Sequence, residues 1–133
     1  MDRVFLGANA LFSAAYRTDA GLLHLWKLRN VTLCSSHYAL EEARANLPAE
    51  DQRGRLAALS EVLELFEPGK SPIPRGIILP SKDVPIMLAA IAASATHLLT
   101  GDVRHFGPYF GKRIQGIEIV LPGNYLRMRA IKI

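Results

Sequence analysis

The sequence predicts an α/β domain in which helices cover both faces of a central parallel sheet. Short apolar runs typical of buried strands alternate with longer stretches typical of helices. Residues 86–93 are rich in Ala and Leu, which favours a buried helix. Residues 97–100 form a short apolar run that ends in a Gly-Asp turn, which favours a buried strand. Strands that alternate with helices imply a three-layer α/β/α arrangement.

The expected elements follow in order along the chain. Strands are expected at residues 4–6, 31–34, 61–66, 77–79, 97–100 and 117–120. Helices are expected at residues 11–16, 22–28, 38–47, 51–60 and 86–93, with a short last helix that begins at Pro122. The strands that begin at Val4, Val31, His97 and Ile117 are expected to supply the core of a sheet of about four or five strands.

Length, charge and cysteine content limit the class of protein. The 133 residues are expected to form one domain, 1–133, with a core of ordinary size. The net charge of +4 permits a nucleic-acid partner without requiring one. No apolar run is long enough to cross a bilayer, so no membrane association is expected. The single Cys34 excludes an internal disulfide, and no signal-peptide pattern is present, so we expect a cytoplasmic protein.

Two carboxylates bracket the expected buried helix and strand. Asp83 stands immediately before the helix, and Asp102 follows the strand after a turn. Both positions fall at the edge of an α/β sheet where such folds place their sites. Two close carboxylates repel unless a cation lies between them, so the pair indicates a hard divalent metal ion. Taken singly, Asp83 is equally well explained as a helix cap and Asp102 as a turn residue.

The chain has four segments, at residues 4–11, 36–43, 83–90 and 98–102, that together resemble the motifs of one family. This is the PIN-domain family, small metal-dependent nucleases that include the VapC-like toxins of bacterial toxin–antitoxin pairs. Residues 83–90 and 98–102 resemble the third and fourth acidic motifs, and their order and spacing are fairly specific. Residues 36–43 resemble the second motif, and residues 4–11 resemble the first. The resemblance covers nearly the whole chain and implies a PIN-like α/β/α fold.

Three carboxylates would form the catalytic centre under this resemblance, namely Asp83, Asp102 and Glu42. They would hold Mg²⁺ or Mn²⁺, and the ions would activate water for attack on a phosphodiester of an RNA substrate. Alignment of the apolar positions favours Glu42 over Glu41 as the contribution of the second motif. Most helix glutamates are solvated, so Glu42 by itself would be weak support.

Further polar residues would assist the carboxylates under the same resemblance. Asn9 and Thr100 would hydrogen-bond to the carboxylates and orient them. Basic residues that follow Asp102 would contact the RNA phosphates and add affinity with little sequence information, namely Arg104, His105, Lys112 and Arg113. The family also implies an antitoxin protein as a possible partner and a homodimer.

The first motif departs from the family pattern at Gly7. The pattern has an aspartate at this position, two residues before Asn9, whereas the Asn and the apolar flanks are retained. Loss of a positioned catalytic group costs on the order of 100-fold or more in rate. We therefore expect the sequence as it stands to fold but to have little nuclease activity. The glycine is either natural to a pseudo-nuclease or an inactivating substitution in a cloned toxin, and the intact acids at the other positions favour the second explanation.

Other classes of protein fit the sequence less well. The runner-up is a catalytically inactive PIN-like module that binds RNA or a protein. A flavodoxin-like signalling receiver also clusters acids, but it needs an acidic pair after the first strand, where this chain has Gly7 and Ala8. The four histidines show no zinc-ligand spacing among themselves, and only His105 lies near the proposed site.

Overall fold

The computed structural model describes residues 1–129 and confirms the expected α/β class. Residues 130–133, the end of the predicted domain, lie outside the described residues. Six strands of the described part form one sheet in the order β3-β2-β1-β4-β6-β5. The strands are β1 (Asp2–Leu6), β2 (Val31–Ser35), β3 (Glu64–Leu65), β4 (His97–Leu99), β5 (Arg113–Ile114) and β6 (Ile117–Val120).

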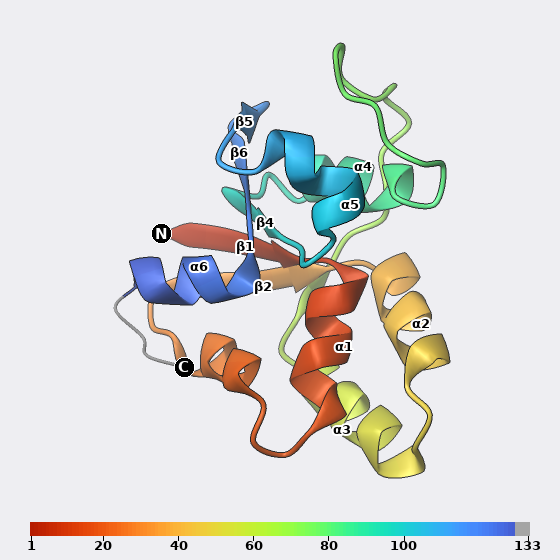
Figure 1. Cartoon of the computed structure of the whole chain (residues 1–133), viewed down its shortest axis with the longest axis vertical. Helices are drawn as coiled ribbons and strands as arrows, with labels where there is room; N and C mark the ends of the chain where they lie inside the picture. The colour runs from red at the N-terminus through yellow and green to blue at the C-terminus, as the bar shows by residue number, and fades with distance from the viewer. Residues whose placement is uncertain (130–133) are drawn as a thin grey trace.

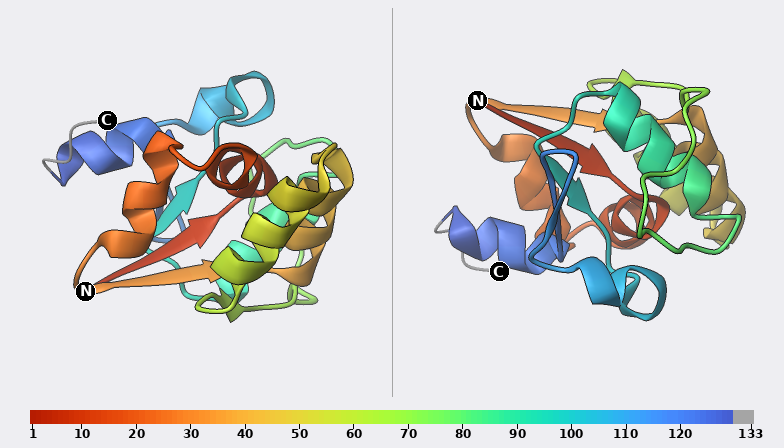
Figure 2. Two further views of the ribbon diagram at one scale, coloured as in Figure 1. Left: turned by 90° about the horizontal axis from the view of Figure 1, so that it is seen from below. Right: turned by 90° about the horizontal axis from the view of Figure 1, so that it is seen from above.

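Helices lie on both faces of this sheet (Figures 1 and 2). They are α1 (Ala8–Tyr16), α2 (His37–Asn46), α3 (Glu50–Ser60), α4 (Val84–Ala92), α5 (Val103–Phe106) and α6 (Pro122–Met128), with 3₁₀ helices η1 (Gly21–Lys27) and η2 (Gly107–Tyr109). Helices α1 and α3 and the 3₁₀ helix η1 cover one face, and α4 covers the other. No helix of residues 1–129 is long and apolar enough to cross a membrane.

The middle of the sheet is parallel and fully buried. Strand β1 lies between β2 and β4, with Phe5 opposite Cys34 on one side and opposite Leu98 on the other. Phe5, Cys34 and Leu98 are all completely buried. A parallel strand covered by helices on both faces has no solvent side, which explains why these strands read as continuous apolar runs. The parallel order also places the carboxyl ends of β1 and β4 beside each other.

The expected strand at residues 77–79 is wrong. Ile78 is 85% exposed, and its backbone N–H and C=O pair with the hydroxyl of Tyr109 at 2.7 and 3.1 Å. A side chain therefore satisfies the backbone polar groups that a strand would direct into a ladder. Prolines at positions 72, 74 and 80 flank the segment and remove further donors.

The expected strand at residues 61–66 is shorter than predicted. Helix α3 extends to Ser60 with Glu61 as its C-cap, so only Glu64–Leu65 lie beside β2. The segment at residues 22–28 is a 3₁₀ helix rather than an amphipathic α-helix. Its leucines recur at positions 22, 25 and 28, a spacing of three that matches the three residues per turn of a 3₁₀ helix.

The edge strand β5 was not expected from the sequence. Arg113 and Ile114 pair antiparallel with Glu118 and Ile117, and the two residues between them form the hairpin loop. Gln115 and Gly116 of that loop have φ values of 50° and 82°. Positive φ at both positions is typical of a type I′ turn, whose twist suits a two-residue hairpin. The sheet thus contains six strands, of which the last pairing is antiparallel.

Candidate functional site

A small pocket opens at the carboxyl ends of β1 and β4. Gly7 lies between β1 and α1, as the N-cap residue of α1, and its N–H donates a 3.0 Å hydrogen bond to the carbonyl of Leu99, the last residue of β4. The pocket has a volume of about 170 Å³. Its polar lining comes from five side chains of four different segments: Asn9, Glu42, Lys82, Asp83 and Asp102, with buried Thr100 beneath them.

Asp83 directs its carboxylate into this pocket instead of capping its own helix. It occupies the N-cap position of α4, but its side chain accepts no hydrogen bond from the helix backbone. The residue is only 6% exposed. Its Oδ1 lies 3.4 Å from the ammonium of Lys82, and its Oδ2 lies 2.9 Å from Nδ1 of His105. The side chain of Asp83 therefore does not act as a helix cap.

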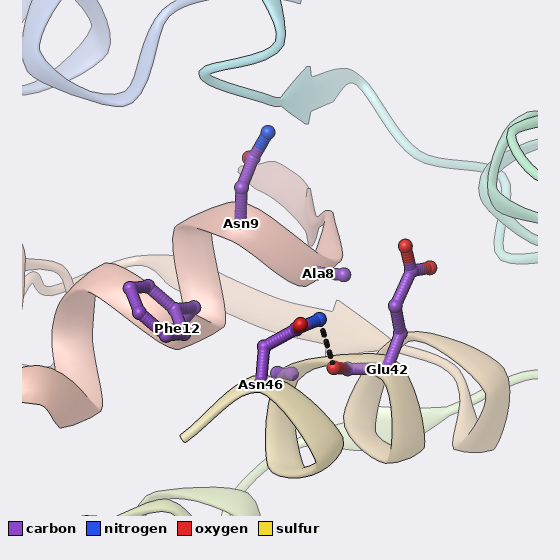
Figure 3. A pocket seen from close by; sticks show the side chains of 6 residues that line it. Ala8, Asn9, Phe12, Glu42 and Asn46 are labelled. Carbon is purple, nitrogen blue, oxygen red and sulfur yellow. Dashed lines mark hydrogen bonds between the residues drawn. The ribbon is translucent and has the colours of Figure 1, made fainter. Parts of the chain in front are cut away.

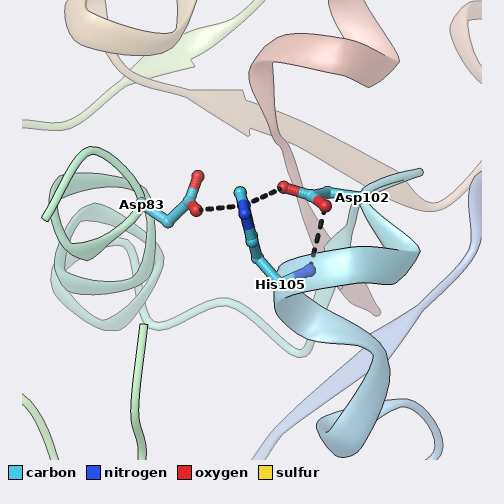
Figure 4. Close-up of side chains that lie close together, drawn as sticks. All are labelled: Asp83, Asp102 and His105. Carbon is cyan, nitrogen blue, oxygen red and sulfur yellow. Dashed lines mark hydrogen bonds and ion pairs between the residues drawn. The ribbon is translucent and has the colours of Figure 1, made fainter. Parts of the chain in front are cut away.

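Asp102 approaches the same imidazole from the opposite side (Figure 4). One of its oxygens accepts a 3.0 Å hydrogen bond from the backbone N–H of His105, which caps α5. The other oxygen lies 2.8 Å from His105 Nδ1. Because the two residues are three positions apart on one helical turn, the imidazole projects back over the carboxylate. Asp102 is thus both a turn residue and a member of the cluster.

The donor atoms of this cluster fit a divalent metal ion. One atom each from Asp83, Asp102 and His105 lie within 4.8 Å of one another. The contacts of His105 Nδ1 are short, but neither has the direction of an N–H hydrogen bond, so Nδ1 and Asp83 Oδ2 are buried atoms without a hydrogen-bond partner. Buried polar atoms of this kind are costly unless another group satisfies them. Two carboxylates and an imidazole are ligands that first-row divalent ions accept.

Asn9 and Thr100 hold the turn that presents Asp102. The side-chain oxygen of Asn9 accepts a 2.8 Å hydrogen bond from the N–H of Gly101 and lies 3.5 Å from the hydroxyl of Thr100. The same hydroxyl accepts a 3.1 Å hydrogen bond from the N–H of Asp102. The structure places these two side chains against the backbone of the turn, so they position Asp102 through the chain that carries it.

Glu42 lines the pocket from α2, whereas Glu41 does not. Glu41 is exposed and lies 3.9 Å from Arg44 on the same helix. Glu42 also lines a neighbouring pocket of about 380 Å³, together with Asn9 and Phe12, and its carboxylate projects away from α2 (Figure 3). The Glu42 carboxylate is not among the three groups whose donor atoms lie within 4.8 Å. Glu42 therefore lines the same pocket but stands outside this cluster.

Tyr38 and Lys82 belong to the site but were not expected from the sequence. The hydroxyl of Tyr38, on α2, donates a 2.6 Å hydrogen bond to the carbonyl of Lys82, immediately before Asp83. Burial raises the pKa of Tyr38, and the negative charges of Glu42 and Asp83 raise it further. This bond ties the loop before α4 to the helix that carries Glu42. Its signal in the sequence is weak, because the two partners are 44 positions apart.

The comparison with solved structures identifies the fold. No family model matches the chain, and no curated protein sequence matches it. The chain is similar to VapBC2 from Rickettsia felis, whose structure was solved bound to a DNA fragment from their promoter. The match has a TM-score of 0.60 and 19% sequence identity, and it covers 88% of this chain and 96% of that chain. The chain has a PIN-type fold. The fold that the acidic motifs implied is therefore confirmed.

Gly7 stands in the wall of the pocket of this PIN-type fold. Its backbone is extended, with φ −71° and ψ 169°, a conformation open to any residue. A Cβ at this position would lie 3.3 Å from the carbonyl oxygen of Leu99 and within 4.0 Å of Thr100 and Ile86. The first contact is tight, so the end of β4 would have to move by a few tenths of an ångström. An aspartate can be accommodated at position 7, but at some cost in packing.

The basic residues expected to contact RNA lie at different distances from this pocket along the PIN-type sheet. Arg104 is exposed on α5, one residue from His105. Lys112 and Arg113 are exposed at the far edge, where Arg113 pairs with Glu118, which in turn pairs with His97. Arg113 is therefore level with the start of β4, whereas the pocket lies beyond its end.

Proposed function

We propose that this PIN-type chain is a metal-dependent endoribonuclease whose activity is impaired by Gly7. The observation that carries the proposal is the convergence of Asp83, Asp102 and Glu42 on one pocket at the carboxyl edge of the parallel sheet. Carboxylates from three separate segments serve no shared purpose in folding, since they repel one another. A cation bound between them accounts for their convergence, and the same cation would attract a substrate that carries negative charge.

Each polar residue of the pocket would have its own role in phosphodiester hydrolysis. Asp83 and Asp102 would hold Mg²⁺ or Mn²⁺, which supplies positive charge to the reacting phosphate when bound. Glu42 faces the pocket without a place in the ligand cluster, so its carboxylate would accept the proton of the attacking water. The water oxygen bonds to phosphorus, the bond to the leaving ribose oxygen breaks, and that oxygen takes a proton from solvent. The ammonium of Lys82 would attract the phosphate.

The biological setting that we propose is the toxin half of a toxin–antitoxin pair. The support is the likeness to VapBC2, whose structure was solved bound to a DNA fragment from their promoter. We accordingly propose an antitoxin protein as partner, an RNA substrate, a homodimer and a cytoplasmic location. Arg104 and the more distant Lys112 and Arg113 would contact the RNA backbone outside the pocket.

The experiment that tests this function compares the protein with Gly7→Asp on structured RNA in Mg²⁺, Mn²⁺ or EDTA. We expect metal-dependent cleavage by Gly7→Asp and at least about 100-fold less by the unmodified chain. Gly7→Asn is the matched control, because Asn has nearly the same size and shape as Asp but carries no charge. Adding Asp102→Ala to Gly7→Asp should abolish cleavage. Absence of cleavage and of cellular toxicity in every form would contradict the proposal.

A second candidate function rests on the absent carboxylate itself. With Gly7 in the first motif, the chain would be an inactive PIN-like module that binds RNA or a protein. The same experiment separates the two, since a binding module stays inactive when Asp is introduced at position 7. Retention of labelled RNA by the unmodified chain in EDTA, without any cleavage by Gly7→Asp in Mn²⁺, is the result that would favour this candidate.

A further inference from the structure

We propose that His105 is a metal ligand, so that the site is formed by two carboxylates and one imidazole and prefers Mn²⁺ or Co²⁺ to Mg²⁺. The inference rests on the metal-dependent function proposed above. It differs from the expectation that His105 contacts RNA phosphate.

The geometry of the three donors carries this inference. His105 Nδ1 lies 2.9 Å from Asp83 Oδ2 and 2.8 Å from Asp102 Oδ2. A ring nitrogen carries at most one proton, so it cannot satisfy both carboxylates with directed hydrogen bonds. Neither contact is in fact directed, and both Nδ1 and Asp83 Oδ2 are buried without a hydrogen-bond partner. A cation bound by all three atoms would satisfy each of them.

The local structure orients the imidazole for this role. Asp102 caps α5 through the backbone N–H of His105, so carboxylate and ring are held on one face of a single helical turn. Asp83 closes the cluster from α4 with a side chain that is only 8% exposed. The three ligands lie on two short rigid elements, and the ligand Asp83 is deeply buried. This gives the cluster the pre-organisation that metal sites need.

The identity of the donors sets the preference among metal ions. Mg²⁺ binds through oxygen, keeps several waters and gains little from a nitrogen ligand. Imidazole favours ions later in the first transition row, and Mn²⁺ and Co²⁺ accept mixed nitrogen and oxygen ligands. A site of two carboxylates and one histidine therefore discriminates against Mg²⁺ more strongly than a site of carboxylates alone.

An opposing explanation predicts the opposite change in metal affinity when the imidazole of His105 is removed. If His105 is a positive ring that neutralises Asp83 and Asp102 in place of a metal ion, it competes with the metal. Removing it would then strengthen metal binding. If His105 is a ligand, removing it weakens binding, and weakens that of Co²⁺ and Mn²⁺ more than that of Mg²⁺.

The test measures binding of Mn²⁺ alone to the unmodified chain and to His105→Gln by calorimetry and by electron paramagnetic resonance. Gln is polar and of similar length but has no nitrogen at the position of Nδ1. We expect at least about a tenfold loss of Mn²⁺ affinity, a smaller loss for Mg²⁺, and ¹⁴N coupling to bound Mn²⁺ that disappears in the variant. His37→Gln is the matched control, because His37 is exposed and lies 2.6 Å from Glu67, outside the cluster.

Two results would overturn the inference. One is tighter Mn²⁺ binding by His105→Gln, and the other is bound Mn²⁺ in the unmodified chain without ¹⁴N coupling, a measurement that needs no variant to fold. Failure of the nuclease proposal is distinguishable from either. A chain that binds Mn²⁺ with nitrogen coupling but cuts no RNA, even as Gly7→Asp, retains the metal site and loses the function. Cleavage in Mg²⁺ without nitrogen coupling retains the function and overturns the histidine ligand.

Discussion

The side-chain oxygen of Asn9 accepts a 2.8 Å hydrogen bond from the backbone N–H of Gly101, although the two residues are 92 positions apart in the sequence. Asn9 stands on the first turn of α1, and Gly101 precedes Asp102 in the turn after β4. The bond therefore joins the ends of two neighbouring parallel strands. It fixes the backbone from which the carboxylate of Asp102 projects.

Replacing Asn9 with Ala should loosen this turn. We expect a loss of about 1 kcal/mol in the free energy of unfolding, because the N–H of Gly101 loses its partner. Mn²⁺ affinity should fall about tenfold, since Asp102 would no longer be held in one orientation. Calorimetry and thermal denaturation measure the two effects. Asn46→Ala is the control, because Asn46 is an exposed asparagine that bonds within its own helix. Equal metal affinity in Asn9→Ala and the unmodified chain would contradict a positioning role.

Introducing a carboxylate at position 7 should destabilise the metal-free protein. Any side chain there meets the carbonyl of Leu99 at a Cβ distance of 3.3 Å, and an Asp adds a third negative charge beside Asp83 and Asp102. We expect Gly7→Asp to melt below Gly7→Asn in EDTA. Mn²⁺ should raise the melting temperature of Gly7→Asp more than that of Gly7→Asn, because the ion binds the folded state. A Gly7→Asp protein that is more stable than Gly7→Asn in EDTA would refute the charge argument.

Tyr38→Phe should release the loop before α4. The 2.6 Å hydrogen bond from Tyr38 to the carbonyl of Lys82 is lost, while the aromatic ring is retained. A loss of about 1 kcal/mol in stability is expected, together with faster proteolysis between residues 68 and 82. Limited trypsin digestion at Arg75 and Lys82 reports on this directly. Cleavage at an unchanged rate would show that the loop is held by its other contacts alone.

Alkaline pH should destabilise the protein through Tyr125. Burial raises the pKa of Tyr125 above its ordinary value of 10.0, and the 2.6 Å hydrogen bond to the carboxylate of Asp2 raises it further. The folded state therefore keeps this proton more tightly than the unfolded state. The resulting stabilisation is complete below pH 10.0 and is lost as the pH rises through the higher pKa of the folded state.

Urea unfolding at pH 8 and above pH 10 measures this loss, and Tyr125→Phe should remove the part of the pH dependence that Tyr125 causes. Tyr16→Phe is the control, because Tyr16 is 44% exposed. If Tyr125→Phe and the unmodified chain lost stability equally between the two pH values, the bond to Asp2 would not be responsible.

Much of the fold could be predicted because its central elements are largely buried. The strands at Val4, Val31, His97 and Ile117 and the helix at residues 84–92 are mostly apolar for that reason. Edge elements carried no comparable signal. Strand β5 is two residues long and is defined by its pairing with β6. Residues 77–79 have the composition of a strand, but the hydroxyl of Tyr109 bonds to the backbone N–H and C=O of Ile78.

The candidate site, too, was predicted from the sequence only in part. Asp83, Asp102 and Glu42 were predicted as one site because their segments resemble the acidic motifs of the PIN-domain family, and the pocket that they line lies where parallel strands end. Their roles remain predictions. His105 was assigned to phosphate binding because it follows Asp102 in a basic stretch, yet it lies between the two carboxylates. Its position depends on the single helical turn of α5, Val103–Phe106, which was not among the helices expected from the sequence.

The sequence by itself determined the α/β class and the central strands, because burial and local propensity act on neighbouring residues. It indicated the acidic segments through their resemblance to the motifs of the PIN-domain family. Only the tertiary structure decided which donors share the pocket. That depends on Asn9 reaching Gly101 and on Tyr38 reaching Lys82, across 92 and 44 positions. Contacts between distant residues are set by how the layers pack. The residue types of the two partners do not by themselves indicate such a contact in the sequence.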